Sequence, residues 1–450
     1  MSRREYEIGS NGAAMGRRQR GIRRGPMSIS WLHTPAPKAP GQIDRTRPLA
    51  ETLSLIPVLR RRFGITRIGD TTALDRIGIP TFCAVVADSP DVISIYNGKG
   101  LTREHSICSA VMEAVERQCG ATIDLPFVPA VPRGVDDIGF AEMGMLPSAY
   151  DRPIDFVSGV ELVTGRTVEV PYAAVRSPWH GDRVFLMSSS SGLASGNTIL
   201  EAVYHALMEY VERHGWAVAH TLAHVRPRIA LEAFARAIGE EFDSTAMIDD
   251  PAVLSVSLPT GDPIIDRLLD LVECAELSLR LMTIPVGDLP TVMMASINEA
   301  DSPLPMSHFG LGASWSPRQA AVRAITEAAQ TRSVDIQGAR EDLLRAEEDS
   351  EIFAHHGRRR AKAPHGRWYY DAPLPTCAFS SLPDRSQQCL AAEVRDLLIA
   401  LVNVGIRRVI VVDLSPANLP VSVVRVLVPD METSIVDGHI GPTARALLSN

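Results

Sequence analysis

The sequence HALMEYVERHG at residues 205–215 occurs in three related forms along the chain. It appears earlier as SAVMEAVERQCG (109–120) and later, less well preserved, as RAITEAAQTRS (323–333). Each copy sets a glutamate among Ala, Val, Leu and Ile at helical spacing, which predicts three helices. The glutamates are Glu113, Glu209 and Glu327, and their separations are far longer than solenoid repeats. We therefore expect a duplicated strand–helix unit whose acidic helices form the walls of one site.

Strand and helix patterns alternate irregularly around these copies. Residues 155–163 and 167–175 predict a hairpin, 279–286 and 290–298 a second strand pair, and 184–190 a further strand. Thr102 is a candidate N-cap, and Thr198 with Glu201 has the spacing of a capping box. Hairpins beside βα pieces predict an α+β fold with mixed or antiparallel sheets and long helices, rather than a doubly wound sheet.

Composition narrows the class of protein. The chain has 450 residues, 45% of them hydrophobic, and a net charge of −8, so it can bury a large core and is no general polyanion binder. It contains no apolar run of about 18 residues, so no membrane span is expected. Its six cysteines are scattered and form no CxxC pair, which disfavours a zinc ribbon and fits a cytoplasmic protein.

The N-terminal residues differ from the rest. Residues 1–26 are rich in Arg and Gly, and residues 27–45 are rich in Pro. We expect a disordered tail and linker over 1–45 and one folded domain over 46–450. The tail has two interpretations: an extension without function, with translation starting at Met27, or a basic arm that binds RNA, membrane or an acidic peptide.

The three predicted helices carry acidic stripes. The stripes are Ser109, Glu113 and Glu116; Glu201, His205, Glu209 and Glu212; and Arg323, Glu327 and Gln330. Any one of them alone fits a solvated face, but such faces usually interleave Lys with Glu, and these contain no Lys. Carboxylates that meet in a buried place repel one another unless cations compensate them. Together the stripes favour a shared cation site.

The residue types suit magnesium and a nucleotide. Glutamate oxygens are hard ligands for Mg²⁺, whose other ligands are usually phosphate oxygens, and Arg213 and Arg323 would contact phosphate. The site is not a P-loop or a Rossmann fingerprint, because NGKG (97–100) and FGLGAS (309–314) lack the required residues. Residues 98–100 and 191–197 fit turns that present backbone N–H groups to an anion, or ordinary tight turns.

Three segments resemble the YcaO family in order and spacing: GKGLTREHSICSAVMEAVER (98–117), SGLASGNTILEAVYHALMEYVER (191–213) and the block 310–342. The resemblance implies a fold without a P-loop that binds ATP and Mg²⁺. It places cofactor-binding roles on Ser109, Glu113, Asn197, Arg213 and Arg323, and metal-binding roles on Glu116, Glu201, Glu209, Glu212 and Glu327. The family also uses an N-terminal lysine near the nucleotide, for which the nearest equivalents are Arg45 and Arg47.

The resemblance also implies a reaction. YcaO proteins activate a peptide backbone amide: a nucleophile adds to the carbonyl, the oxyanion takes the γ-phosphoryl group of ATP, and phosphate leaves. A neighbouring Cys, Ser or Thr gives an azoline ring, and an external sulfide equivalent gives a thioamide. The sequence predicts no protein nucleophile.

Residues 45–53, 64–80 and 423–433 resemble the branch that works with a TfuA-like partner, and the chain ends in GPTARALLSN rather than a Pro-rich tail. We therefore expect a thioamide-forming enzyme that acts on a peptide or protein, with a TfuA-like partner and as a homodimer. Three alternatives remain. They are an azoline-forming cyclodehydratase of ribosomal peptide natural products, a non-enzymatic accessory factor for ribosomal protein methylthiolation, and a nucleic-acid-binding protein acting through the tail.

Overall fold

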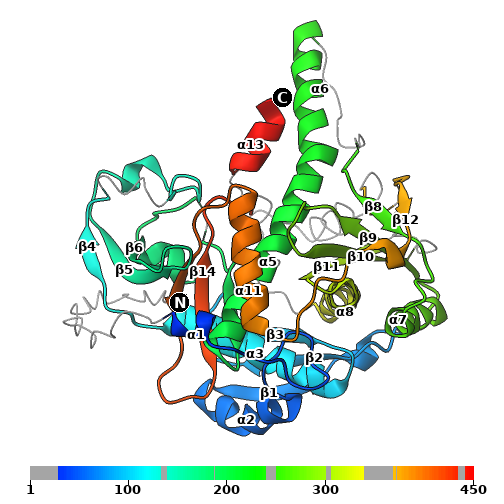
Figure 1. Cartoon of the computed structure of the whole chain (residues 1–450), viewed down its shortest axis with the longest axis horizontal. Coiled ribbons are helices and arrows are strands. Elements are labelled where there is room, and N and C mark those ends of the chain that lie inside the picture. The colour runs from blue at the N-terminus through cyan, green and yellow to red at the C-terminus, as the bar shows by residue number, and fades with distance from the viewer. Residues whose placement is uncertain are drawn as a thin grey trace, which may run out of the picture.

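The computed structural model describes residues 29–132, 139–186, 188–239, 250–299, 306–338, 368–370, 372–433 and 441–449. Three sheets lie around a group of long helices (Figure 1). Their strands pair almost entirely antiparallel, so the predicted α+β class is confirmed. No helix in the described part of the chain is long and apolar enough to cross a membrane.

The first sheet has the order β1-β2-β3. Its strands are β1 (Ile65–Asp70), β2 (Thr81–Val86) and β3 (Ile95–Lys99), with the short helix η1 (Thr72–Leu74) between the first two. Helix α3 (Arg103–Thr122) packs on β2 and β3, and α2 (Leu49–Arg62) packs on α3. The Thr102 side chain accepts the backbone N–H of His105, so the predicted N-cap of α3 is confirmed.

The second sheet has the order β4-β5-β13-β14-β7, with β6 paired to β5. Its strands are β4 (Val128–Ala130), β5 (Ile154–Glu161), β6 (Thr167–Pro171), β7 (Leu193–Gly196), β13 (Ile410–Asp413) and β14 (Ser422–Leu427). The predicted hairpin is confirmed as β5 and β6. Helix α5 (Ile199–His220) packs on β7 and β14 and begins at Thr198, which accepts the N–H of Glu201.

The prediction of a strand at 184–190 is wrong for the described residues of that segment. Phe185 makes a single bridge with Met145 there. The strand β7 lies instead in the segment 191–197 that was predicted as a turn, because its backbone pairs with β14, with Ser195 opposite Val423.

The third sheet has the order β11-β10-β9-β8-β12. Its strands are β8 (Leu254–Val256), β9 (Ser278–Ile284), β10 (Thr291–Glu299), β11 (Met306–Ser314) and β12 (Thr376–Cys377), of which β12 is parallel to β8. The predicted strand pair is confirmed as β9 and β10. Helix α8 (Pro317–Gln337) packs on β10 and β11, and α7 (Pro263–Cys274) packs on α8 and β9.

The remaining helices connect or cover these layers. They are α1 (Ser30–His33), η3 (Pro147–Ala149), α4 (Tyr172–Val175), η4 (Thr221–Val225), α6 (Arg226–Ile238), η5 (Phe379–Ser381), α11 (Leu390–Asn403) and α13 (Pro442–Ser449). The π-helical turn η4 joins α5 to α6, and Figure 1 shows α6 continuing the line of α5 away from the sheets.

Residues 29–45 differ from the linker that the sequence predicts. The backbone N–H of Lys38 donates to the Gln388 carbonyl at 2.9 Å. The Lys38 ammonium lies 2.6 Å from the buried Glu393 carboxylate on α11. Paired backbone and a buried ion pair hold this segment on the domain, so the folded part includes residues 29–45. Residues 1–28 lie outside the described residues.

The predicted strand–helix duplication is confirmed as β3–α3, β7–α5 and β11–α8. In each unit a strand at the edge of its sheet packs on the helix that follows it. Glycine makes the close approach possible: a Cβ atom on Gly98 would lie 2.2 Å from the Ala110 nitrogen, and one on Gly312 would lie 2.2 Å from the Ala320 oxygen. The acidic face of each helix therefore lies beside a sheet edge.

Candidate functional site

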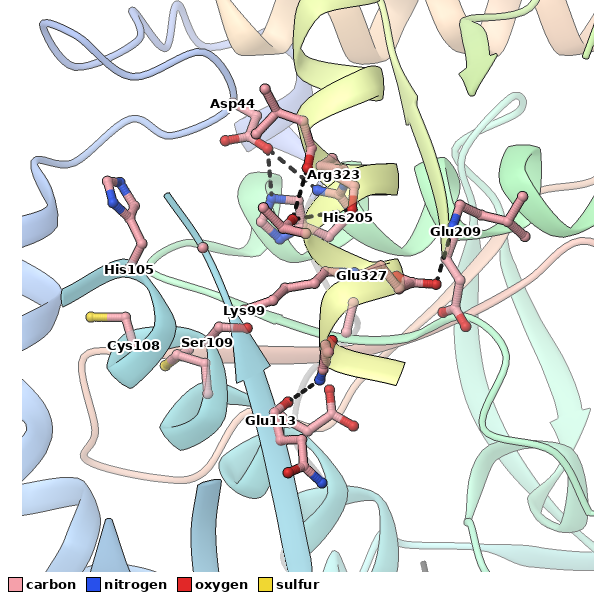
Figure 2. Close-up of a pocket in the computed structure, with 18 of the residues that line it drawn as sticks. Asp44, Lys99, His105, Cys108, Ser109, Glu113, His205, Glu209, Arg323 and Glu327 are labelled. Carbon is pink, nitrogen blue, oxygen red and sulfur yellow. Dashed lines mark hydrogen bonds and ion pairs between the residues drawn. The ribbon is translucent and has the colours of Figure 1, made fainter. Parts of the chain in front are cut away.

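The three strand–helix units and residues 41–47 surround one cavity of about 1240 Å³. Figure 2 shows its side chains converging from α3, α5, α8 and the end of β3. Nine of the ten predicted site residues line it: Ser109, Glu113, Glu116, Asn197, Glu209, Glu212, Arg213, Arg323 and Glu327. Residues spread over more than 200 positions of the sequence thus meet in one place.

Backbone N–H groups of the sheet edges fix the carboxylates of the cavity. An edge strand presents unpaired N–H groups, and a carboxylate oxygen is a strong acceptor for them. Each pair joins a helix to an edge strand or its flank: Ser195 donates to Glu116 at 2.9 Å, Gly192 to Glu209 at 3.1 Å, Ala313 to Glu212 at 2.8 Å and Leu311 to Glu327 at 3.3 Å. These contacts orient the acidic side chains toward one another.

Cations lie among these carboxylates. The Lys99 ammonium pairs with Glu327, as Figure 2 shows, and Arg213 Nη2 lies 2.9 Å from Glu209 Oε1. Burial would raise the pKa of Glu327, but the charge and hydrogen bond of Lys99 outweigh it and lower that pKa. Glu327 on α8 is therefore held as a carboxylate by a cation at the end of β3.

Two other carboxyl groups of the cavity, those of Glu113 and Glu116, have raised pKa values. Burial raises the pKa of Glu116 well above its usual value, and the charges of Glu113 and Glu209 raise it further. Burial also raises the pKa of Glu113, again with a contribution from Glu209. Raised carboxyl pKa values inside a cavity mark a place where an added cation would be stabilising.

The N-terminal segment forms a further wall. Asp44 Oδ2 lies 3.5 Å from Arg323 Nη1, and the effect of burial is outweighed by the charges of Arg45 and Arg323, so that the pKa of Asp44 falls to about 2. His205 Nδ1 lies 3.0 Å from the Arg45 guanidinium and 3.3 Å from the Ser195 carbonyl oxygen. Arg45 and Arg47, the predicted equivalents of the family's lysine, both line the cavity.

Glu201 is the predicted site residue that does not line the cavity. It is fully buried, and its two oxygens accept four hydrogen bonds of 2.6 to 2.9 Å from the backbone and side chains of Thr46 and Asn197. In this arrangement Glu201 joins the N-terminal segment to Asn197, which lines the cavity. These hydrogen bonds indicate that Glu201 positions other residues of the site.

Sequence reasoning missed two residues of the cavity, Lys99 and Asp44. Lys99 lies in a glycine-flanked segment that was considered only as a turn, although the chain has three lysines and this one directly precedes the first acidic helix. Asp44 falls in the expected linker, so its sequence carried no signal. Both contacts depend on segments distant in sequence.

The donor set fits Mg²⁺. Among the described residues, no three His, Cys, Asp or Glu side chains lie close enough together to hold a metal ion in the present arrangement. However, Glu113, Glu116, Glu209, Glu212 and Glu327 share one cavity with Lys99 and arginines. The carboxylate oxygens are the ligands that Mg²⁺ prefers, and the cationic side chains are suited to phosphate. The individual metal and nucleotide assignments stay predictions.

Comparison with known proteins agrees with this geometry. A family model described as an ATP- and Mg²⁺-binding YcaO cyclodehydratase matches residues 97–432. An uncharacterised protein of Methanothermobacter thermautotrophicus is 32% identical over 398 residues, which are 86% of this chain and 95% of that protein. A protein of Rhizobium leguminosarum bv. trifolii encoded in the tfuA 3′ region is 31% identical over 90% of this chain and 92% of its own length.

Solved structures share the fold. YcaO from Methanopyrus kandleri, bound with AMPPCP and Mg²⁺, has a TM-score of 0.64 and 23% identity over 88% of this chain and 95% of its own. A heterocyclase in complex with substrate and cofactor has a TM-score of 0.68 and 19% identity over 91% of this chain and 55% of its own.

Proposed function

Because this chain belongs to the YcaO family and is an ATP-dependent enzyme with ATP and Mg²⁺ as cofactors, we propose that it phosphorylates a backbone amide of a peptide or protein and forms a thioamide. The observation that supports the proposal is the meeting of carboxylates from α3, α5 and α8 with Lys99 and two arginines in one cavity. Such a site holds a triphosphate and its metal without a P-loop.

The chemistry follows from charge. A sulfur nucleophile adds to the amide carbon, loses its proton, and moves the carbonyl electrons onto oxygen. That oxygen attacks the γ-phosphorus, so an O–P bond forms while the bond to the ADP oxygen breaks. Phosphate then leaves with the former carbonyl oxygen, the C–O bond breaks, and C=S remains.

The protein's own residues supply positioning and neutralisation. Arg213, Arg323 and Lys99 would turn from their carboxylates to phosphate oxygens, while the released carboxylates would hold Mg²⁺, which supplies further charge neutralisation. Arg213 and Arg323 are charged throughout, because nearby carboxylates raise the pKa of both against the effect of burial. We propose no covalent enzyme intermediate.

Two observations bear on the product. The Rhizobium relative is encoded in the tfuA 3′ region, which favours a TfuA-like partner and hence a thioamide. The family description names cyclodehydratases, which favours an azoline as the second candidate. The two products differ in mass, because one exchanges oxygen for sulfur and the other loses water.

The experiment is phosphate release from ATP with Mg²⁺, using the purified chain alone and then with a TfuA-like protein, a sulfide source and peptides encoded nearby. Peptide-dependent phosphate release with oxygen-for-sulfur exchange in the mass spectrum is the expected result. Loss of water would replace the thioamide by an azoline. Absence of ATP binding and turnover would overturn the proposal and favour an accessory protein.

A further inference from the structure

The cavity is larger than a nucleotide site needs. Ligand pockets typically measure about 300–1,000 Å³, and this one measures about 1240 Å³. It extends along α8 from Arg318 to Asp335, which is about 26 Å of helix at about 1.5 Å per residue. Glu212 lies 3.6 Å from Arg323, and Glu327 lies about one helical turn beyond Arg323, so the Asp335 end is the part of the cavity farther from these two carboxylates.

The wall of that second part is a sheet edge. Ser307, His308, Phe309 and Leu311 of β11 line the cavity, and β11 is the terminal strand of its sheet. Its register with β10 runs without a break from residue 306 to residue 314. N–H directions therefore alternate strictly between the partner strand and the cavity.

Two hydrogen bonds show which N–H groups of β11 point away from β10. The N–H groups of Leu311 and Ala313 point away from β10, because they donate to Glu327 and Glu212. The N–H groups of Phe309 and Ser307 share that direction. Within the described ranges neither has an acceptor in the protein. Two outward N–H groups thus line the cavity directly beside two that carboxylates occupy.

A buried polar atom supports a missing ligand here. His308 lines the same region, is 5% exposed, and pairs through Nε2 with Asp335 at 3.2 Å. Its Nδ1 is buried and has no hydrogen-bond partner among the described residues. Buried polar atoms in proteins are almost always satisfied by protein, water or ligand. Phe309 and Tyr369, whose rings lie 5.3 Å apart, also line the cavity.

We propose that the substrate peptide binds as an added β-strand on the edge of β11 at Ser307–Phe309. This inference rests on the proposed function. Each two-residue step along the edge is about 7 Å. The added strand has to stop where Glu327 and Glu212 already occupy the edge, so its next amide enters the carboxylate cluster. Recognition through backbone groups selects an extended chain, and the aromatic wall selects the side chains.

The probe is the peptide that stimulates phosphate release in the preceding experiment, labelled with fluorescein and bound in the presence of Mg²⁺ and AMPPCP. A series of peptides is made in which each carries one N-methyl group, at a different backbone nitrogen. Loss of one hydrogen bond should weaken binding about five- to tenfold at every second position. A scan without this alternation overturns the inference.

Two variants test the protein side. Ser307→Pro removes one outward N–H without removing a bond to β10, because proline is tolerated at such edge positions. Ser307→Ala measures the loss of the hydroxyl, which bonds Ser296 at 2.8 Å. The ratio of the two peptide affinities should be about five- to tenfold, with equal affinity for Mg–AMPPCP in both variants.

The outcomes separate this inference from the proposed function. Equal peptide affinities in the two variants, with peptide-dependent turnover intact, overturn strand addition alone. A wild-type chain that binds Mg–AMPPCP but no peptide overturns the proposed function and the inference with it.

Discussion

The Lys99 ammonium at the end of β3 and the Glu327 carboxylate on α8 form an ion pair across the cavity (Figure 2). The two residues are 228 positions apart: Lys99 ends a strand of the first sheet, and Glu327 lies on a helix that packs on the third sheet. Lys99 thus brings a cation from a distant strand into a site that has no P-loop. Both side chains are partly exposed to the cavity, so the pair can open to admit a phosphate.

Replacing Lys99 by methionine should lower kcat/KM for ATP about 100-fold, because a charge that stabilises the transferred phosphoryl group is lost. Lys99→Arg should retain more activity, since it keeps the charge. Steady-state phosphate release with saturating peptide measures both. Wild-type turnover in the methionine variant would show that the ion pair is only structural.

Replacing Glu209 or Glu212 by glutamine should abolish ATP turnover and weaken Mg²⁺-dependent nucleotide binding, because an amide is a poorer Mg²⁺ ligand than a carboxylate. Glu273 on the exposed face of α7 provides the matched control, Glu273→Gln. Calorimetric titration of Mg–AMPPCP separates binding from chemistry. Normal turnover in both cavity variants would remove the metal-site assignment.

Glu201→Gln should behave differently from those variants. Four donors point at the Glu201 oxygens, and an amide would turn its own N–H groups toward some of them. Leaving buried donors unsatisfied costs about 1–3 kcal/mol. Urea unfolding should therefore show a loss of stability of that size. A variant with wild-type stability and no Mg–AMPPCP binding would make Glu201 a direct ligand.

Much of the site was predictable because its helices carry their chemistry at a fixed period. Glu113, Glu209 and Glu327 recur in the same short sequence motif, and helix geometry alone places each of them on one face of its own helix with the neighbouring site residues. Contacts made by irregular backbone gave no such pattern. Asp44 reaches Arg323 from a Pro-rich segment whose composition is typical of a linker. Only the tertiary pairing of that segment with α11 orders it.

The strand β7 shows the same limit for the fold. Residues 191–197 contain two glycines and three serine or asparagine residues, which locally favour a turn. Pairing with β14 overrides that preference, with Ala194 opposite Val424. The glycine at 196 is needed for a different reason: a Cβ atom there would lie 2.6 Å from the Ala202 nitrogen of α5.

Gly98→Ala should destabilise the fold by about 1–3 kcal/mol or more, because the added methyl group would overlap the backbone of α3. Gly69→Ala in β1 of the same sheet is the control, since its Cβ would meet the movable Cys83 side chain at 3.1 Å. Urea unfolding of both variants measures the difference. Equal stabilities would show that α3 shifts freely on its strand.

The stability of the wild-type protein should fall as the pH drops below about 6.5, the usual pKa of histidine, partly through His205. Burial lowers the pKa of His205 well below that value, and the Arg45 charge lowers it further. The unfolded chain therefore binds a proton that the folded chain excludes, so the stability present above that pH is lost on acidification. Protonation of the ring would also place a positive charge against the Arg45 guanidinium, which lies 3.0 Å from His205 Nδ1.

His205→Asn keeps an acceptor for Arg45 but does not titrate. Its unfolding midpoint should decline less than that of the wild type between about pH 7 and pH 5. All other residues are the same in the two proteins, so their contributions cancel in the comparison. Parallel curves for the two proteins would mean that His205 is protonated equally in the folded and unfolded chains. The wall formed by residues 44–47 would then not depend on a neutral imidazole.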